Sequence, residues 1–399
     1  MARVLTDRSI ITGSGAQRHA TWLELFFDLV VVAAVATLGE QLHDDHSISG
    51  VLRFAGLLAV VWWVWISYSY FADLFDEDGP VDRVAQLAAM LGTAVLAVTL
   101  ANGVGEGSRI LALTCCALFV LLALLYATAA RAEPEAAELC RWYAFGSGLG
   151  AVMWAVSAFV PVPGRWWMWG AAVVANAAVS GPIAYARMRS APAQASHMPE
   201  RFGLFTIVVL GEAVLAVVRG VDATEWATGP VVSAMAGFVV AACIWWVYFD
   251  AFDESAIDRA IEGGRRAQVR AFLYGYGHLL IFAAVVAAGA GVELGIAEAA
   301  QGDAAPALLG WASTAVIAGF VLISQGIGLS VHPVAIAAKA LVVVTSVVVA
   351  VVSVPATAGA VAVAGAWLLL VLVEVRISSA TANPPGPIDE RSTPRSPGT

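Results

Sequence analysis

The sequence predicts an all-α, polytopic integral membrane protein with about 12 transmembrane helices in two parallel six-helix pseudo-repeats. Composition is the first reason: 60% of the 399 residues are hydrophobic and 13% are charged, whereas a soluble domain carries about 25% charged residues. A series of apolar runs of membrane-spanning length is the second. Motifs that recur in the same order in each half of the chain are the third.

The apolar runs set the predicted spans. A hydrocarbon core of about 30 Å requires about 20 apolar residues in a helix. Runs near this length lie at residues 21–39, 53–72, 83–101, 109–130, 141–160, 166–187, 202–219, 229–250, 269–290, 306–327, 333–353 and 357–376. Residues 1–19 are a polar tail, so the first run is predicted to be a retained span. Residues 378–399 contain five prolines and are predicted to be a disordered tail.

The positive residues predict the orientation. Of the 21 lysine and arginine residues, 17 fall in the tails or in alternate loops on the same side as the N-terminus. The four on the other side are Arg53, Arg109, Arg165 and Arg219. Cytoplasmic loops carry the excess of positive charge. We therefore expect both termini to be cytoplasmic and the protein to reside in the cell membrane.

Three sequence matches in the same order indicate an internal repeat. The first pairs residues 19–32, HATWLELFFDLVVV, with residues 197–210, HMPERFGLFTIVVL. Residues 73–78 read DLFDED and residues 250–255 read DAFDES, and each follows a Trp-Trp-Val segment. Ala-Gln-Leu at 85–87 and Ala-Gln-Val at 267–269 come next in each half. The predicted repeats are residues 20–189 and 190–377, and six spans in each give both halves the same orientation. Some secondary transporters have such parallel repeats, with their sites between the halves.

A few charged residues fall inside the predicted spans, where an ionisable group is energetically unfavourable and usually functional. Glu24 and Asp28 are four residues apart and share one helix face. In the corresponding span of the second half, Arg201 lies at the cytoplasmic end and Glu212 lies about 15 Å further in. One interpretation is a carboxylate site for a proton, a cation or a cationic substrate. The other is a structural Glu24–Arg201 ion pair with a solvated Asp28 beside it.

His278 is a further candidate for the same site. It lies in the predicted span 269–290, beside Tyr274 and Tyr276. Imidazole titrates near neutral pH and suits proton handling. The alternative is a structural histidine that is held by hydrogen bonds.

Several functions are excluded or unsupported by the sequence. A net charge of −9 and a single lysine, Lys339, exclude a basic surface for nucleic acid. The chain contains no zinc-protease, nucleophile-elbow or Walker motif, so we expect neither enzymatic activity nor a cofactor. Its four cysteines lie in or beside apolar runs without C-x-x-C spacing, so no metal site is expected.

Two segments resemble the bacterial low temperature requirement protein A family. They are residues 21–30, TWLELFFDLV, and residues 200–214, ERFGLFTIVVLGEAV. DLFDED at 73–78 and YGYGHLLIF at 274–282 fit the same resemblance. The motif positions are Glu24, Phe26, Phe27, Asp28, Glu200, Arg201, Gly211 and Glu212. The family takes its name from a cold-growth phenotype, so the resemblance implies an integral membrane protein without implying a particular activity.

The repeat and the intramembrane carboxylates lead to one functional hypothesis. It is a secondary transporter or exporter of a small solute, coupled to protons or cations, with Asp28, Glu212, Glu24, Arg201 and His278 as site residues. Its partners would be the lipid bilayer and that solute, and the sequence gives no oligomeric state. The alternatives are a membrane-embedded lipid-binding protein or enzyme of cold adaptation, and a structural or sensory membrane subunit.

Overall fold

The structure is a computed structural model that describes residues 21–75, 79–101, 105, 108–178, 198–222, 224–250, 264–327 and 332–382. Within these residues the chain forms twelve α-helices and no strand. They are α1 (Trp22–Asp44), α2 (Ile48–Leu74), α3 (Pro80–Ala101), α4 (Ser108–Ala132), α5 (Ala137–Ser157), α6 (Gly164–Ala178), α8 (Met198–Asp222), α9 (Thr228–Asp250), α11 (Gly264–Gln301), α12 (Ala307–Ile327), α13 (Pro333–Val351) and α14 (Ala356–Ala382). The predicted N-terminal tail, residues 383–399 of the predicted C-terminal tail, residues 76–78 and most of the second acidic motif lie outside the described residues. Residues 378–382 were predicted to belong to the disordered tail, but they form the last residues of α14.

The predicted fold class is confirmed. Ten of the described helices are long and apolar enough to cross a membrane. The other two are α5 and α6. The described part of α6 is only 15 residues long, and α5 carries Arg141, Trp142 and Tyr143 in its N-terminal half, which lower its hydropathy. The structure is thus that of a multi-pass membrane protein.

The outer faces of the helices are apolar, as a lipid environment requires. On α3, Leu87, Leu91 and Val98 are exposed, and on α14 Leu368 and Leu372 are exposed. In water such patches would be a strong aggregation hazard. In a bilayer these side chains would meet acyl chains of the same polarity, so the exposed surface agrees with the membrane assignment.

The helix that departs most from its predicted span is α11. The apolar run at 269–290 corresponds to α11, which continues to Gln301 and is 38 residues long. Its extension includes Glu293, whose carboxylate lies 3.5 Å from the guanidinium of Arg219 on α8. Because an ion pair compensates this charge, the helix can continue past the point where hydropathy predicts its end.

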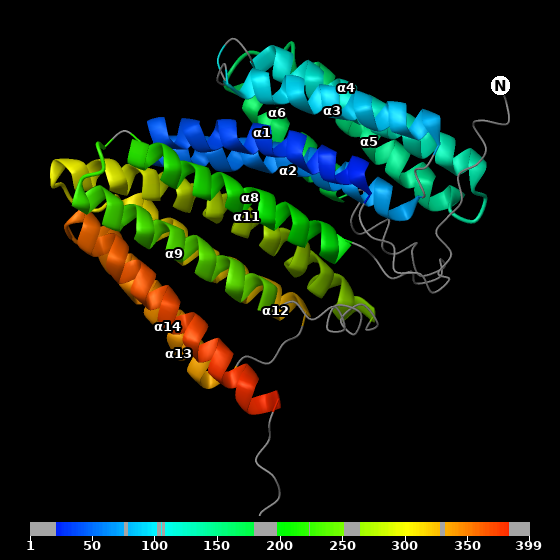
Figure 1. Cartoon of the computed structure of the whole chain (residues 1–399). Coiled ribbons are helices and arrows are strands. Elements are labelled where there is room, and N and C mark those ends of the chain that lie inside the picture. The colour runs from blue at the N-terminus through cyan, green and yellow to red at the C-terminus, as the bar shows by residue number, and fades with distance from the viewer. Residues whose placement is uncertain are drawn as a thin grey trace, which may run out of the picture.

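Figure 1 shows the order in which the helices are packed. Helices α1 and α2 lie between the α3–α6 group on one side and α8 and α11 on the other, with α13 and α14 at the far edge. The N-terminal half (α1–α6) contacts the C-terminal half (α8–α14) mainly through α1 and α2 against α8 and α11. Within each half the first helix packs on both the second and the third, and later helices pack on their chain neighbours. This correspondence agrees with the repeat, which stays a prediction.

Small residues allow the closest helix contacts. A Cβ at Gly310 of α12 would collide with the backbone oxygen of Ser346 on α13. A Cβ at Gly277 of α11 would lie 2.9 Å from the side chain of Ile323 on α12. Without a hydrophobic driving force between helices in lipid, close van der Waals packing of this kind holds a bundle together.

Candidate functional site

The site begins at the N-terminus of α1. Thr21 is its N-cap: the Thr21 hydroxyl accepts a hydrogen bond from the backbone N–H of Glu24, and the Glu24 carboxylate accepts one from the Thr21 N–H at 2.8 Å. This capping box fixes the first turn of the helix. Asp28 follows one turn later on the same face. Both carboxylates are buried, with Glu24 6% exposed and Asp28 1% exposed.

Asp28 joins the two halves of the chain through a buried ion pair. Its Oδ1 accepts a hydrogen bond from the indole Nε1 of Trp65 on α2 at 2.6 Å. The same oxygen lies 3.3 Å from Nη2 of Arg201 on α8. Nη1 of Arg201 lies 3.5 Å from the backbone oxygen of Ser69, one turn beyond Trp65. Three helices therefore meet at one carboxylate, and the Asp28 and Arg201 side chains are only 2% and 4% exposed.

This polar cluster leaves hydrogen-bonding capacity unused. Asp28 Oδ2, Arg201 Nε and Ser69 Oγ are buried and have no hydrogen-bond partner within the described part of the chain. A buried polar atom without a partner costs about 1–3 kcal/mol. Such an atom in a native structure calls for an explanation, and an ordered water molecule or a bound ion is a common one. The cluster therefore has the polarity of a site that takes up a small polar species.

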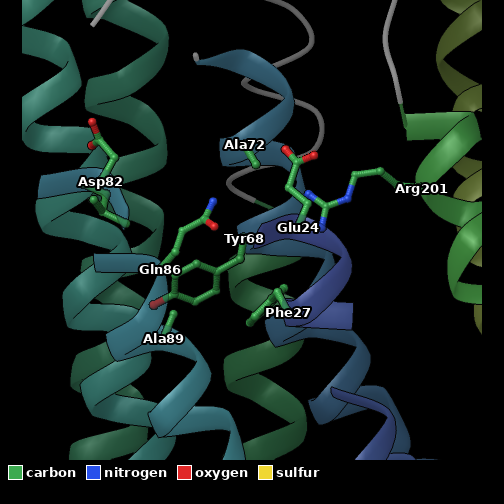
Figure 2. A pocket seen from close by; sticks show the side chains of 9 residues that line it. Glu24, Phe27, Tyr68, Ala72, Asp82, Gln86, Ala89 and Arg201 are labelled. Atoms are coloured by element: carbon green, nitrogen blue, oxygen red, sulfur yellow. The ribbon is translucent and has the colours of Figure 1, made fainter. Parts of the chain in front are cut away.

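A small pocket opens beside the ion pair (Figure 2). It is lined by Glu24, Phe27, Tyr68, Ala72, Asp82, Gln86, Ala89, Leu125 and Arg201. The charged groups of Glu24 and Arg201 are turned toward each other, and Gln86 projects from α3 toward Tyr68. The enclosed space is enough for about a single water molecule. In this conformation the pocket suits water or a proton, and not a drug-sized solute.

An aromatic wall separates the ion pair from His278. The Trp65 ring stacks on Phe205 with centroids 4.4 Å apart, and Phe202 meets Trp65 edge-on at 5.6 Å. On the other side of Phe202, the His278 imidazole stacks at 4.1 Å. Asp28 and His278 thus belong to one packed core without direct contact.

Both nitrogens of His278 are within hydrogen-bond distance of a partner. Nδ1 lies 2.7 Å from the Tyr274 backbone oxygen, and Nε2 lies 2.9 Å from the Tyr248 hydroxyl. A carbonyl only accepts, so Nδ1 carries a hydrogen and donates it to the Tyr274 backbone oxygen. The ring is fully buried, and both of its nitrogens are engaged by groups of the protein.

Glu212 lies elsewhere in the bundle. It is eleven residues beyond Arg201 on α8, which is about 16 Å along a helix axis. Its carboxylate pairs at 3.0 Å with Arg219, which also lies 3.5 Å from Glu293 on α11. This second charged group, which joins α8 to α11, does not converge with Asp28.

The structure therefore divides the predicted site residues. Asp28 and Arg201 are in contact, Glu24 and Arg201 line the same pocket, His278 lies behind the aromatic wall, and Glu212 belongs to the second charged group. The interpretation with a solvated Asp28 differs from the structure, since Asp28 is the more deeply buried carboxylate.

Four residues of the site were not predicted. Trp65 and Ser69 come from α2, which is apolar on all sides and offers no polar stripe to indicate its orientation. Asp82 and Gln86 come from the first turns of α3 and are four residues apart on one face. Among the described residues no group of three or more histidine, cysteine, aspartate or glutamate side chains is arranged to hold a metal ion.

The fold and this site define a polytopic α-helical membrane protein with a buried ion pair between the two halves of the chain. The chain belongs to the bacterial low temperature requirement A protein (LtrA) family, whose model matches residues 19–376. This confirms the resemblance found in the sequence. The chain is also 25% identical over 326 residues to the uncharacterized protein RA0937 of Rhizobium meliloti (strain 1021), a match that covers 72% of this chain and 76% of that protein. No solved structure matches the chain.

Proposed function

We propose that the protein is a secondary transporter or exporter of a small solute, coupled to protons or cations, and that the Asp28–Arg201 pair is its charge-handling site. One observation carries the proposal. A buried carboxylate on the first helix of one half is held by a buried guanidinium on the first helix of the other half, with unused polar atoms on both sides.

Stability alone is a poor explanation for this pair. Apolar residues of similar volume in place of a buried ion pair are often neutral or stabilising. Ionisable residues inside membrane bundles are characteristically found on ion and substrate pathways. A carboxylate that exchanges its guanidinium partner for a proton or a cation would release α1 from α8, and with it one half of the bundle from the other.

The other predicted residues have roles around that exchange. Glu24 would receive the proton or cation at the pocket. Glu212, through Arg219 and Glu293, would hold α8 to α11 at a distance from the main site. Helix α8 would then have two charged contacts along its length, one at Arg201 and one at Arg219. His278 would hold the Phe202 ring, on which it stacks, in a fixed position within the aromatic wall.

The proposal is tested in proteoliposomes. A pH gradient is imposed across the vesicle membrane, and a pH-sensitive dye inside the vesicles reports proton movement. Na⁺, K⁺ or tetramethylammonium is added outside the vesicles as the ion that moves with, or in exchange for, the proton. We expect gradient-driven flux with wild type and its loss with Asp28→Asn. Asp303→Asn is the matched control, because Asp303 is an exposed carboxylate in the α11–α12 connection, and its flux should equal that of wild type.

Three other results would redirect the assignment. Equal fluxes in wild type and Asp28→Asn would refute the role of Asp28. Absence of any flux in wild type, together with marked instability of Asp28→Asn, would favour a structural or sensory subunit. Co-purified lipid that Asp28→Asn loses would favour the lipid-binding alternative.

A further inference from the structure

We infer that the species exchanged at Asp28 is a proton rather than a metal cation, and that it reaches Asp28 Oδ2 from the water-sized pocket lined by Glu24, Asp82 and Gln86. This inference rests on the proposed function and names its coupling ion. It also adds Asp82 and Gln86 to the machinery as the entry to the pocket.

The neighbours of Asp28 disfavour a metal ion. Arg201 Nη2 lies 3.3 Å from the carboxylate oxygen Oδ1, and the Trp65 N–H occupies that same oxygen at 2.6 Å. A metal cation at Asp28 would lie against the guanidinium and would need several further oxygen ligands. A proton needs only one oxygen, and Oδ2 is buried and has no partner within the described residues.

We place the route to that oxygen through the pocket because of Arg201. Its side chain both pairs with Asp28 and lines the pocket, so one residue links the pocket to the carboxylate. Gln86 Oε1 is buried and lacks a partner among the described residues, and Arg201 Nε is likewise unsatisfied. A water molecule between such groups would satisfy an acceptor and a donor at once. Asp82 and Glu24, which are 7% and 6% exposed, provide carboxylates along the wall.

The proton transfer balances without another reactant. A protonated Glu24 or Asp82, or a hydronium ion in the pocket, gives up its O–H bond while water relays the proton, and a new O–H bond forms at Asp28 Oδ2. The carboxylate becomes a neutral acid, and Arg201 loses its counter-charge. The helices that hold these two residues, α1 and α8, then lose the charge–charge attraction between them at this point.

Other ionisable groups face Asp28 from the helices around α1. Glu24 lies on α1 itself and Arg201 on α8, and these act on Asp28 most directly. Asp82 faces the pocket from α3 and Tyr68 from α2, where its hydroxyl donates to the Leu118 backbone oxygen at 2.7 Å. On α11, His278 and Tyr274 contact Phe202, on the far side of the aromatic wall. These ionisable residues interact with one another. A titration curve measured for the site therefore describes all of them together and cannot be assigned to Asp28 alone.

Two measurements on the full-length protein test the inference. Infrared difference spectra between neutral and acid pH should show a carboxylic-acid C=O band that Asp28→Asn lacks and Asp82→Asn and Gln86→Leu retain. In proteoliposomes with a pH gradient, proton flux should fall about 100-fold in Asp28→Asn, the range expected for loss of a positioned proton carrier. Asp82→Asn and Gln86→Leu should each reduce it by less than Asp28→Asn does, because they slow entry of the proton and leave the acceptor at Asp28 in place.

The outcomes separate this inference from the proposed function. Flux driven by a Na⁺ gradient and indifferent to pH would overturn proton coupling and leave transport intact. A titrating Asp28 band in a protein without flux would overturn transport and support protonation at Asp28. A spectrum that Asp28→Asn does not change would overturn the inference whatever the flux. Wild-type flux in both Asp82→Asn and Gln86→Leu would overturn the entry route.

Discussion

Removal of one partner from the Asp28–Arg201 pair should destabilise the protein far more than removal of both. The informative set is Asp28→Asn, Arg201→Met and the double variant. The Asp28→Asn side chain keeps an oxygen for the Trp65 N–H, which donates at 2.6 Å in the wild type, so the cycle isolates the ion pair. The Arg201→Met side chain retains apolar length and removes the charge.

The expected magnitude follows from the geometry. At 3.3 Å and an effective dielectric constant of about 20, the attraction is about 5 kcal/mol. Desolvation of each ion offsets several kcal/mol of this, so the intact pair contributes little net stability. A single variant leaves one charge buried alone and should cost about 3–5 kcal/mol. The double variant has no such charge and should lie close to wild type.

Reversible unfolding of the purified protein in mixed detergent micelles measures these free energies. We expect the cost of Arg201→Met to shrink at acid pH, because Asp28 can then bind a proton in place of the guanidinium. The stability of Asp28→Asn itself should not change with pH through this site, since a guanidinium stays charged. If the double variant were destabilised by the sum of the two single costs, the side chains would not be coupled and the pairing would be refuted.

Three further predictions concern packing, the histidine and a loop carboxylate. Gly310→Ala should disrupt the α12–α13 contact and lower the unfolding free energy. In the control Gly365→Ala the new Cβ meets open space, so the unfolding free energy should rise by about 0.5–1 kcal/mol. Equal effects of the two substitutions would refute the packing argument. His278→Phe keeps the ring stack and loses two hydrogen bonds, so it should cost about 2 kcal/mol in the same unfolding assay, and a neutral result would contradict the assigned bonds. At Asp45, outside the spans, hydrogen bonds from Ser47 lower the pKa of the carboxyl; its contribution to stability is thus present at neutral pH and lost at acid pH. An unfolding comparison of Asp45→Asn with wild type should show a difference at neutral pH only, and a difference that persists in acid would contradict it.

The fold was accessible from the sequence because the bilayer imposes a simple rule. A spanning segment must satisfy its backbone hydrogen bonds internally and must be apolar over its length. Hydropathy therefore predicted the helices well, with the largest error at α11, where the Glu293–Arg219 pair permits a charge within the helix. Such a pair joins residues that are 74 positions apart, and no local pattern reveals it.

The candidate site was only partly accessible. The rarity of charges within apolar runs singled out Asp28, Arg201 and Glu212. Spacing on α1 placed Glu24 and Asp28 on one face, but it did not show which of them meets α8, since that depends on how far one helix is shifted along the other. A shift of one turn, about 5.4 Å, exchanges their roles. For the same reason the sequence led us to place Glu212 and Asp28 in one site. In the structure Glu212 lies about three helical turns beyond Arg201, the residue that pairs with Asp28.

The sequence by itself determined the class of protein, the approximate spans and the few residues that carry charge into them, because composition and hydropathy act locally along the chain. Only the tertiary structure decided which charges meet, how deeply Asp28 is buried, and that Trp65, Ser69, Asp82 and Gln86 belong to the same site. The physical reason is that an apolar helix presents nearly equivalent faces to its neighbours. Its rotation and depth are set by packing against other helices, through contacts between residues far apart in the sequence.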